Sequence, residues 1–193
     1  MRTHFSSKLI LPVSKRDHIS GPASAPVTLV EYGDYECPYC GLANPIVDEI
    51  RRELGDGLRF VFRNFPLSEV HPHSEQAAEI AEAAGMHHKF WEMHDMLYAH
   101  QDALNDQDLA EYVALLGVPT SEVKLALSQH AYSDRIREDF MSGVRSGVNG
   151  TPTFFLGLAD GNGSQIKGTR IVGAVPYQTF KEAIDKLLTP PAK

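Results

Sequence analysis

The two cysteines of this 193-residue chain, Cys37 and Cys40, are separated only by Pro38 and Tyr39 in the stretch "VEYGDYECPYCGLANP". One pair of cysteines cannot build the multi-bridge scaffold of a small secreted protein. A C-x-x-C motif is instead typical of a redox pair or of half a metal site, or it arises by coincidence. The position of the pair relative to the predicted secondary structure favours the redox interpretation.

A helix is predicted to begin at or just after Cys37. The first N–H groups of a helix lack intrahelical partners and carry partial positive charge, which favours a thiolate and lowers the pKa of Cys37. Pro38 suits the first turn, because its missing N–H would have no partner there. Cys40 lies on the same helix face, near enough to form a disulfide but screened by the turn. We therefore expect Cys37 to attack and Cys40 to resolve.

Two acidic residues, Asp34 and Glu36, lie close to this helix start and oppose its effect. Negative charge near the sulfur raises the pKa of Cys37. Solvent screening would weaken both carboxylates if they are exposed. The sequence alone leaves open which effect prevails.

Apolar patterning predicts strand, helix and strand in the first third of the chain, at residues 27–32, 37–54 and 58–65. Helical periodicity dominates the middle of the chain, over residues 73–85, 88–100, 105–117, 119–130 and 134–147. Two further strands and a helix follow, at residues 151–158, 166–173 and 176–188, with the two strands forming a hairpin around a loop at 159–165.

This order predicts an α/β fold of β-α-β followed by β-β-α, with an all-α insertion between the halves. Residues 1–66 and 147–193 are expected to form one domain, and residues 67–146 an inserted helical subdomain. Residues 1–26 are interpreted as a polar lead-in to the first domain.

The arrangement resembles the thioredoxin fold, and within it the DsbA-like family of thiol–disulfide oxidoreductases. The motif "CPYC" lies between a strand and a helix, and Pro45 follows where this fold often carries a kinking proline. Glu31 stands where the fold often buries a carboxylate. "GTPTF", with Thr151 and Pro152, resembles the loop whose cis-proline faces the cysteines. The helical insertion is the DsbA-like feature.

The resemblance implies disulfide exchange through Cys37 and Cys40, without a metal or organic cofactor. Glu31 would have a raised pKa and would shuttle the proton of Cys40. Pro38, Tyr39, Thr151 and Pro152 are the candidate substrate-binding residues, the last two because a cis bond would turn the Thr151 backbone toward a substrate strand. The expected partners are protein or peptide thiols and disulfides, with glutathione or a thioredoxin-type system as the recycling thiol.

Two other functions remain open on the residues. The cysteine pair could bind a soft metal such as copper or zinc for delivery, with histidines as further ligands. Their spacings fit no standard zinc motif, so we expect His71 and His73 in a polar loop and His94 in helix packing. A glutathione-dependent transferase or isomerase on the same fold would need only the first cysteine.

Composition excludes several partners. A net charge of −7 argues against binding to nucleic acid or to an anionic membrane surface. No apolar run approaches the roughly 20 residues that span a bilayer. The apolar piece "LILPV" near the N-terminus is too short for a secretion signal. We therefore expect a cytoplasmic protein, and a monomer, since no segment is typical of a dimerisation element.

Overall fold

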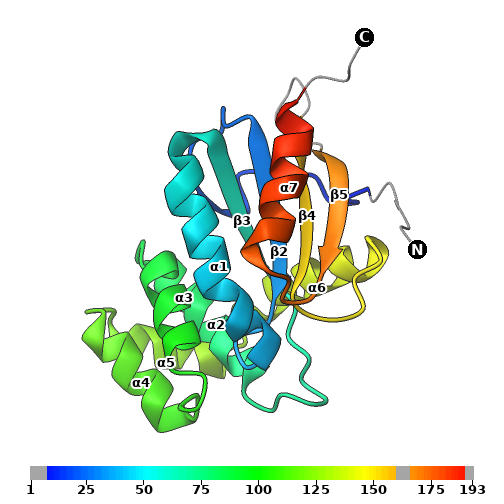
Figure 1. Cartoon of the computed structure of the whole chain (residues 1–193). Coiled ribbons are helices and arrows are strands. Elements are labelled where there is room, and N and C mark those ends of the chain that lie inside the picture. The colour runs from blue at the N-terminus through cyan, green and yellow to red at the C-terminus, as the bar shows by residue number, and fades with distance from the viewer. Residues whose placement is uncertain (1–7, 160–165, 190–193) are drawn as a thin grey trace.

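The computed structural model describes residues 8–159 and 166–189 and has one mixed sheet at its centre (Figure 1). The strand order across the sheet is β1-β3-β2-β4-β5. Strand β2 pairs in parallel with β3 and antiparallel with β4, while β1 and β5 are antiparallel to their neighbours. The strand bounds are β1 His18–Ser20, β2 Val27–Gly33, β3 Leu58–Asn64, β4 Thr153–Ala159 and β5 Ile166–Val172.

Strand β2 lies in the middle of the sheet and leads directly into the cysteine motif. All of its residues are buried, as expected for a continuous apolar run covered on both faces. Its Glu31 aligns with Phe62 of β3 on one side and with Phe154 of β4 on the other. The predicted β-α-β and β-β-α halves are therefore both present around one central strand. The loop of the predicted β4–β5 hairpin, residues 160–165, lies outside the described residues.

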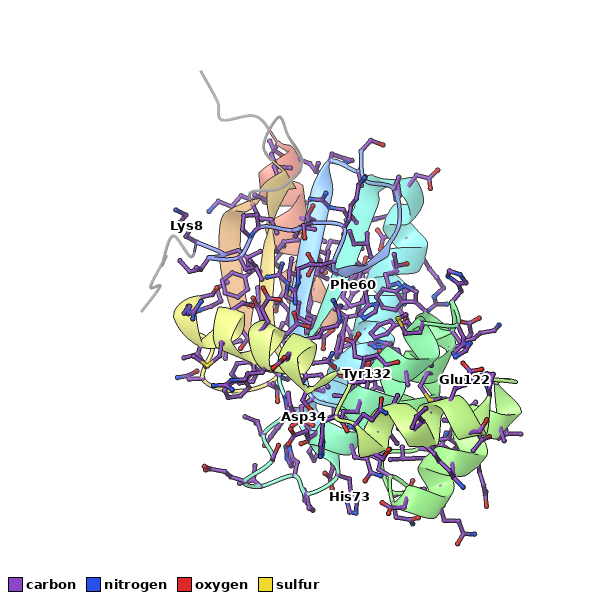
Figure 2. The ribbon with its side chains drawn as sticks, turned by 180° about the vertical axis from the view of Figure 1, so that it is seen from behind. Lys8, Asp34, Phe60, His73, Glu122 and Tyr132 are labelled. Carbon is purple, nitrogen blue, oxygen red and sulfur yellow. The ribbon has the colours of Figure 1, made fainter. Side chains whose placement is uncertain are left out.

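Helices cover both faces of the sheet and one of its ends (Figure 1). Helices α1 and α7 lie on one face, and α6 packs against β3 on the other, as the reverse view shows (Figure 2). The remaining helices pack mainly on one another beyond the sheet end that carries the cysteines. The helix bounds are α1 Pro38–Leu54, α2 Ser74–Gly85, α3 Phe90–Ala99, α4 Asp106–Leu115, α5 Thr120–Ser128, α6 Ser133–Arg145 and α7 Tyr177–Leu188.

No helix in the described part of the chain is both long and apolar enough to cross a membrane. The helical insertion predicted between the two halves of the fold is present as α2 to α6. Its last helix, α6, belongs to the packing of the sheet, because Phe140 contacts the apolar cluster that covers the face opposite α1.

Helix α1 has a start and an end that its sequence explains. Cys37 is the N-cap and has extended backbone angles, and Pro38 occupies the first turn. Pro45 lies inside the helix, where it removes one backbone hydrogen bond. Gly55 ends the helix with a φ of 47°, a conformation that favours glycine. The helix buries the face that carries Cys40 and Val47 against the sheet.

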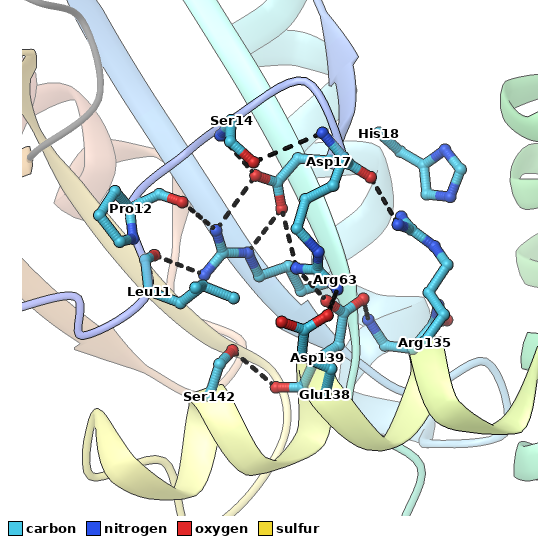
Figure 3. Close-up of polar contacts among 12 residues, drawn as sticks. Leu11, Pro12, Ser14, Asp17, His18, Arg63, Arg135, Glu138, Asp139 and Ser142 are labelled. Carbon is cyan, nitrogen blue, oxygen red and sulfur yellow. Dashed lines mark hydrogen bonds and ion pairs between the residues drawn. The ribbon is translucent and has the colours of Figure 1, made fainter.

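The segment before β2, which the sequence suggested was a polar lead-in, contains a strand and makes buried contacts with the sheet. Residues His18–Ser20 form β1, which the sequence patterning did not indicate. Arg63 of β3 is fully buried and donates to Asp17, to the carbonyl oxygens of Leu11 and Pro12, and to the Tyr32 hydroxyl (Figure 3). These bonds attach the N-terminal segment to the face of the sheet that α6 covers.

Candidate active site

Cys37 and Cys40 are both free thiols at the start of α1, next to the end of β2. Cys37 is 3% exposed and its Sγ lies 3.5 Å from the carbonyl oxygen of Thr151, to which it donates. Cys40 is completely buried, and its Sγ accepts the backbone N–H of Asp34 at 3.5 Å. The Cys37 sulfur therefore faces the loop that precedes β4, and the Cys40 sulfur faces the protein interior.

The environment of Cys37 favours its thiolate. A hydrogen bond from the Cys40 thiol lowers the pKa of Cys37 most strongly. Burial opposes this, and the Thr151 side chain and the backbone N–H groups of Cys40 and Tyr39 add to the lowering. The net result is a pKa of about 5, against an ordinary value of 9.0. The N–H groups of the first turn of α1 act in the expected direction, but they contribute less than the Cys40 thiol.

The two acidic residues near Cys37 are each paired with a histidine, and neither is among the main causes of the shift in the pKa of Cys37. Asp34 Oδ2 lies 2.8 Å from His71 Nδ1, and Glu36 Oε1 lies 2.9 Å from His73 Nδ1. Both histidines belong to the loop between β3 and α2, which packs against the active-site turn. The effects that favour the thiolate therefore outweigh the two carboxylates, with the hydrogen bond from Cys40 contributing more than the N–H groups of the helix start.

The environment of Cys40 has the opposite effect and favours the protonated thiol. Burial raises the pKa of Cys40 well above 9.0, and the hydrogen bond to Cys37 and the charge of Glu31 raise it further. Glu31 is buried in β2, and its burial, together with the charges of Asp48 and Cys37, raises its pKa to about 8. At neutral pH this carboxyl is mostly protonated and can donate a proton to a Cys40 thiolate, whereas only its ionised form could accept the proton of Cys40 and raise the pKa of that thiol.

Replacing Glu31 by glutamine is expected to stabilise the reduced protein by on the order of 3 kcal/mol near pH 7. The pKa of Glu31 rises from 4.5 to about 8 on folding, so folding takes up a proton between these values and stability falls as pH rises through them. The gain should vanish as pH falls toward 4.5, where the unfolded chain also keeps the proton. Urea unfolding of both proteins at several pH values checks this, and a gain independent of pH would contradict the assignment.

Two of the candidate substrate-binding residues follow Cys37 directly in the chain, and the other two lie in the loop before β4, which faces Cys37. Pro38 and Tyr39 are exposed, the latter at 63%. The Thr151–Pro152 peptide bond is cis, and the Thr151 carbonyl faces the Cys37 sulfur. Thr151 is partly exposed and Pro152 is buried, so of these four residues Pro38 and Tyr39 are the exposed ones.

Sequence reasoning missed Gln101, which follows α3. Its Nε2 donates to the carbonyl oxygens of Tyr35 and Cys37, at 2.7 Å and 2.9 Å. This amide links the helical insertion to the active-site turn. It packs tightly over Gly41, where any side chain would collide with it. A glutamine in a polar stretch gives no local signal for such a contact.

The histidines that suggested a metal site pair with carboxylates or pack among aromatic side chains. Among the described residues, no group of three or more histidine, cysteine and acidic side chains is placed to hold a metal ion. His94 is buried in an aromatic cluster with Tyr35, Phe62 and Tyr98. Burial lowers its pKa to about 3, so it stays neutral and contacts the Tyr35 hydroxyl through Nδ1.

Comparison with known proteins agrees with this geometry. Residues 13–186 match the thioredoxin family, and the chain belongs to that family. Among curated proteins, it is 48% identical over 149 residues to the Na⁺/H⁺ antiporter NhaA 1 of Salinispora arenicola. This match covers 77% of the chain but 23% of the antiporter, so the chain spans about a quarter of the length of the relatives it matches.

Solved structures show the DsbA-like form of the fold. BdbD from Bacillus subtilis, in its oxidised state, matches with a TM-score of 0.77 at 24% identity, covering 97% of this chain and 99% of BdbD. The alpha-DsbA1 protein of Wolbachia pipientis matches with a TM-score of 0.76 at 21% identity, covering 93% and 94% of the two chains. The chain therefore has the thioredoxin-like fold with the helical insertion of the DsbA-like proteins.

Proposed function

We propose that the chain is a thiol–disulfide oxidoreductase that exchanges disulfides with protein or peptide substrates through Cys37 and Cys40. The observation that carries the proposal is the opposite shift of the two pKa values: Cys37 at about 5 and Cys40 well above 9.0. One sulfur is ready to attack at neutral pH, and the other stays protonated until it is needed.

The reaction proceeds by two exchanges at sulfur. When the dithiol acts, the Cys37 thiolate attacks one sulfur of a substrate disulfide, that bond breaks, and the leaving sulfur takes a proton. Cys40 then attacks Cys37 Sγ in the mixed disulfide, and its proton passes to the departing sulfur, which leaves as the second substrate thiol. The protein becomes the disulfide, and the substrate gains two electrons and two protons. Oxidation of a substrate dithiol is the reverse sequence.

The direction of net exchange follows from the Cys37 thiolate. The thiolate exists only in the dithiol form, so its stabilisation favours that form and makes the disulfide an oxidant. A pKa of about 5 lies below the roughly 7 of thioredoxin. We therefore infer a reduction potential less negative than the roughly −270 mV of thioredoxin, and a net role as a donor of disulfides.

The reactivity of Cys37 is expected to depend on pH with a midpoint near its pKa of about 5. The thiolate is the nucleophile, so alkylation by iodoacetamide should be nearly constant at neutral pH and fall about tenfold for each unit below the midpoint. The measurement is the rate of alkylation of Cys37, followed by mass at each pH. A rate that still rises at pH 8 would show an ordinary thiol and contradict the proposed activation.

A Cys40→Ser protein tests the division of roles. Without the resolving thiol, it should accumulate a mixed disulfide at Cys37 with a disulfide-containing peptide or with glutathione, detected as an intact adduct by mass. The matched Cys37→Ser protein should accumulate none. Absence of the adduct in Cys40→Ser would sink the assignment. Full catalytic turnover by Cys40→Ser with glutathione would instead favour a transferase or isomerase that needs only Cys37.

Several finer properties stay predictions from the sequence. These are recycling by glutathione or a thioredoxin-type system, a cytoplasmic location, a monomeric state and independence from metal. The antiporter relatives are more than three times as long as this chain, and the proposal concerns only the segment that they share with it.

A further inference from the structure

The loop between β3 and α2 is fastened to the active-site turn by the carboxylate of Asp34. This carboxylate is buried, and it accepts the backbone N–H of Leu67 and the Nδ1–H of His71, both at 2.8 Å through Oδ2. Its other oxygen accepts the N–H of Glu36 at 2.9 Å. Figure 2 shows Asp34 at the end of the sheet, above the loop that carries His73.

Asp34 is also in contact with both halves of the redox pair through its backbone. Its N–H donates to Cys40 Sγ at 3.5 Å, and its carbonyl oxygen accepts the N–H of Cys37 at 3.2 Å. The buried carboxylate therefore belongs to a residue whose backbone contacts both cysteines. A buried negative charge without a counter-ion at this position would disfavour a thiolate at Cys37.

The imidazole of His71 is the cation available to balance that charge. Its side chain is 18% exposed, and its ring is held between the solvent and the buried carboxylate. Burial alone would lower the pKa of His71, but the hydrogen bond to Asp34 and the charges of Asp34, Cys37 and Glu36 raise it above its ordinary value. Since the influence of two charges is mutual, the protonated ring also favours the Cys37 thiolate.

We propose that His71 is a positioning residue of the redox site, whose imidazolium balances the buried Asp34 carboxylate and so lets Cys37 exist as a thiolate. The inference rests on the proposed function and names a residue outside the C-x-x-C motif that regulates it. The other charged groups that act on the ring are the Cys37 thiolate and Glu36, whose carboxylate is paired with His73. Among the described residues, His71 is the histidine whose ring contacts the Asp34 carboxylate.

His71→Asn separates charge from hydrogen bonding, because the asparagine amide can still donate to Asp34 but carries no charge. The pKa of Cys37, followed by thiolate absorbance at 240 nm in the reduced protein without substrate, should rise by about half a unit to one unit. The equilibrium constant with glutathione should move by the corresponding factor of about three to ten toward the protein disulfide. His71→Lys, which keeps a positive charge, should retain the low pKa and serves if the asparagine variant does not fold.

Two matched variants make the outcome specific. His73→Asn removes the neighbouring ion pair with Glu36. Because the His73 side chain is 41% exposed and its charge is screened by solvent, this change should shift the pKa of Cys37 clearly less than His71→Asn does. The double variant Asp34→Asn, His71→Asn removes both charges and should return the pKa of Cys37 toward its original value. An unchanged thiolate titration in folded His71→Asn would overturn the inference. This readout needs no turnover, so it stays separate from a failure of the wild-type protein to exchange disulfides.

Discussion

Replacing Cys37 by serine is expected to abolish disulfide exchange, with a loss of at least about a thousandfold in rate. A hydroxyl cannot form the mixed disulfide, and Cys40 cannot take over the attack. Cys40 is completely buried, and its pKa is raised well above 9.0, so it is neither accessible nor ionised at neutral pH. Reduction of a disulfide-containing peptide, followed by mass, measures the loss.

The matched change at Cys40 gives the control. Cys40→Ser should lose turnover as well, yet keep rapid alkylation at Cys37, because the N–H groups of the first turn still favour the thiolate. Some rise in the pKa of Cys37 is expected, since the hydrogen bond from the Cys40 thiol is its largest stabilising contact. Appreciable exchange by Cys37→Ser would show that the reacting sulfur has been assigned wrongly.

Replacing Arg63 by methionine is expected to cost about 3–5 kcal/mol of stability, because it leaves a buried charge without its partner. Arg63 and Asp17 are both fully buried, and their closest approach is 2.8 Å (Figure 3). The guanidinium also donates to the carbonyl oxygens of Leu11 and Pro12. The change therefore removes the contacts that attach the N-terminal segment to the sheet.

Unfolding in urea or guanidinium chloride measures this cost. Arg52→Met is the matched control: Arg52 is exposed on α1, and its loss should change stability by less than about 0.5 kcal/mol. Protease digestion of Arg63→Met should also cut residues 8–17 faster than the wild-type segment. A loss of less than about 1 kcal/mol would show that the buried pair contributes little.

Most of the fold could be predicted from local patterns in the sequence. The apolar run "VTLVEYG" identified the central strand, and the 3.6-residue periodicity of segments such as "HKFWEMHDMLYAH" identified the inserted helices. Strand β1 was not predicted, because a three-residue edge strand is too short to show alternation of apolar and polar residues. It forms through its pairing with β3, which is distant in the chain.

The candidate site likewise contains residues that the sequence predicts and contacts that only the structure shows. The C-x-x-C motif, its helix start and the glycine–threonine–proline loop lie in short stretches whose residue types are informative. The contacts of Asp34 with His71 and of Gln101 with the Cys37 carbonyl join residues far apart in sequence. No periodic sequence pattern marks either contact, so both can be identified only once the loop conformations are known. The opposing effects on the pKa of Cys37 could be weighed only after these pairings were located.

The most direct test of the redox assignment is the equilibrium between dithiol and disulfide at Cys37 and Cys40. The protein would be equilibrated in mixtures of reduced and oxidised glutathione, its free thiols trapped, and the number of trapped thiols counted by mass. The account predicts a reversible two-electron transition, with a midpoint less negative than the roughly −270 mV of thioredoxin. A protein that forms no intramolecular disulfide in any mixture would contradict the account and leave metal binding as the function to test.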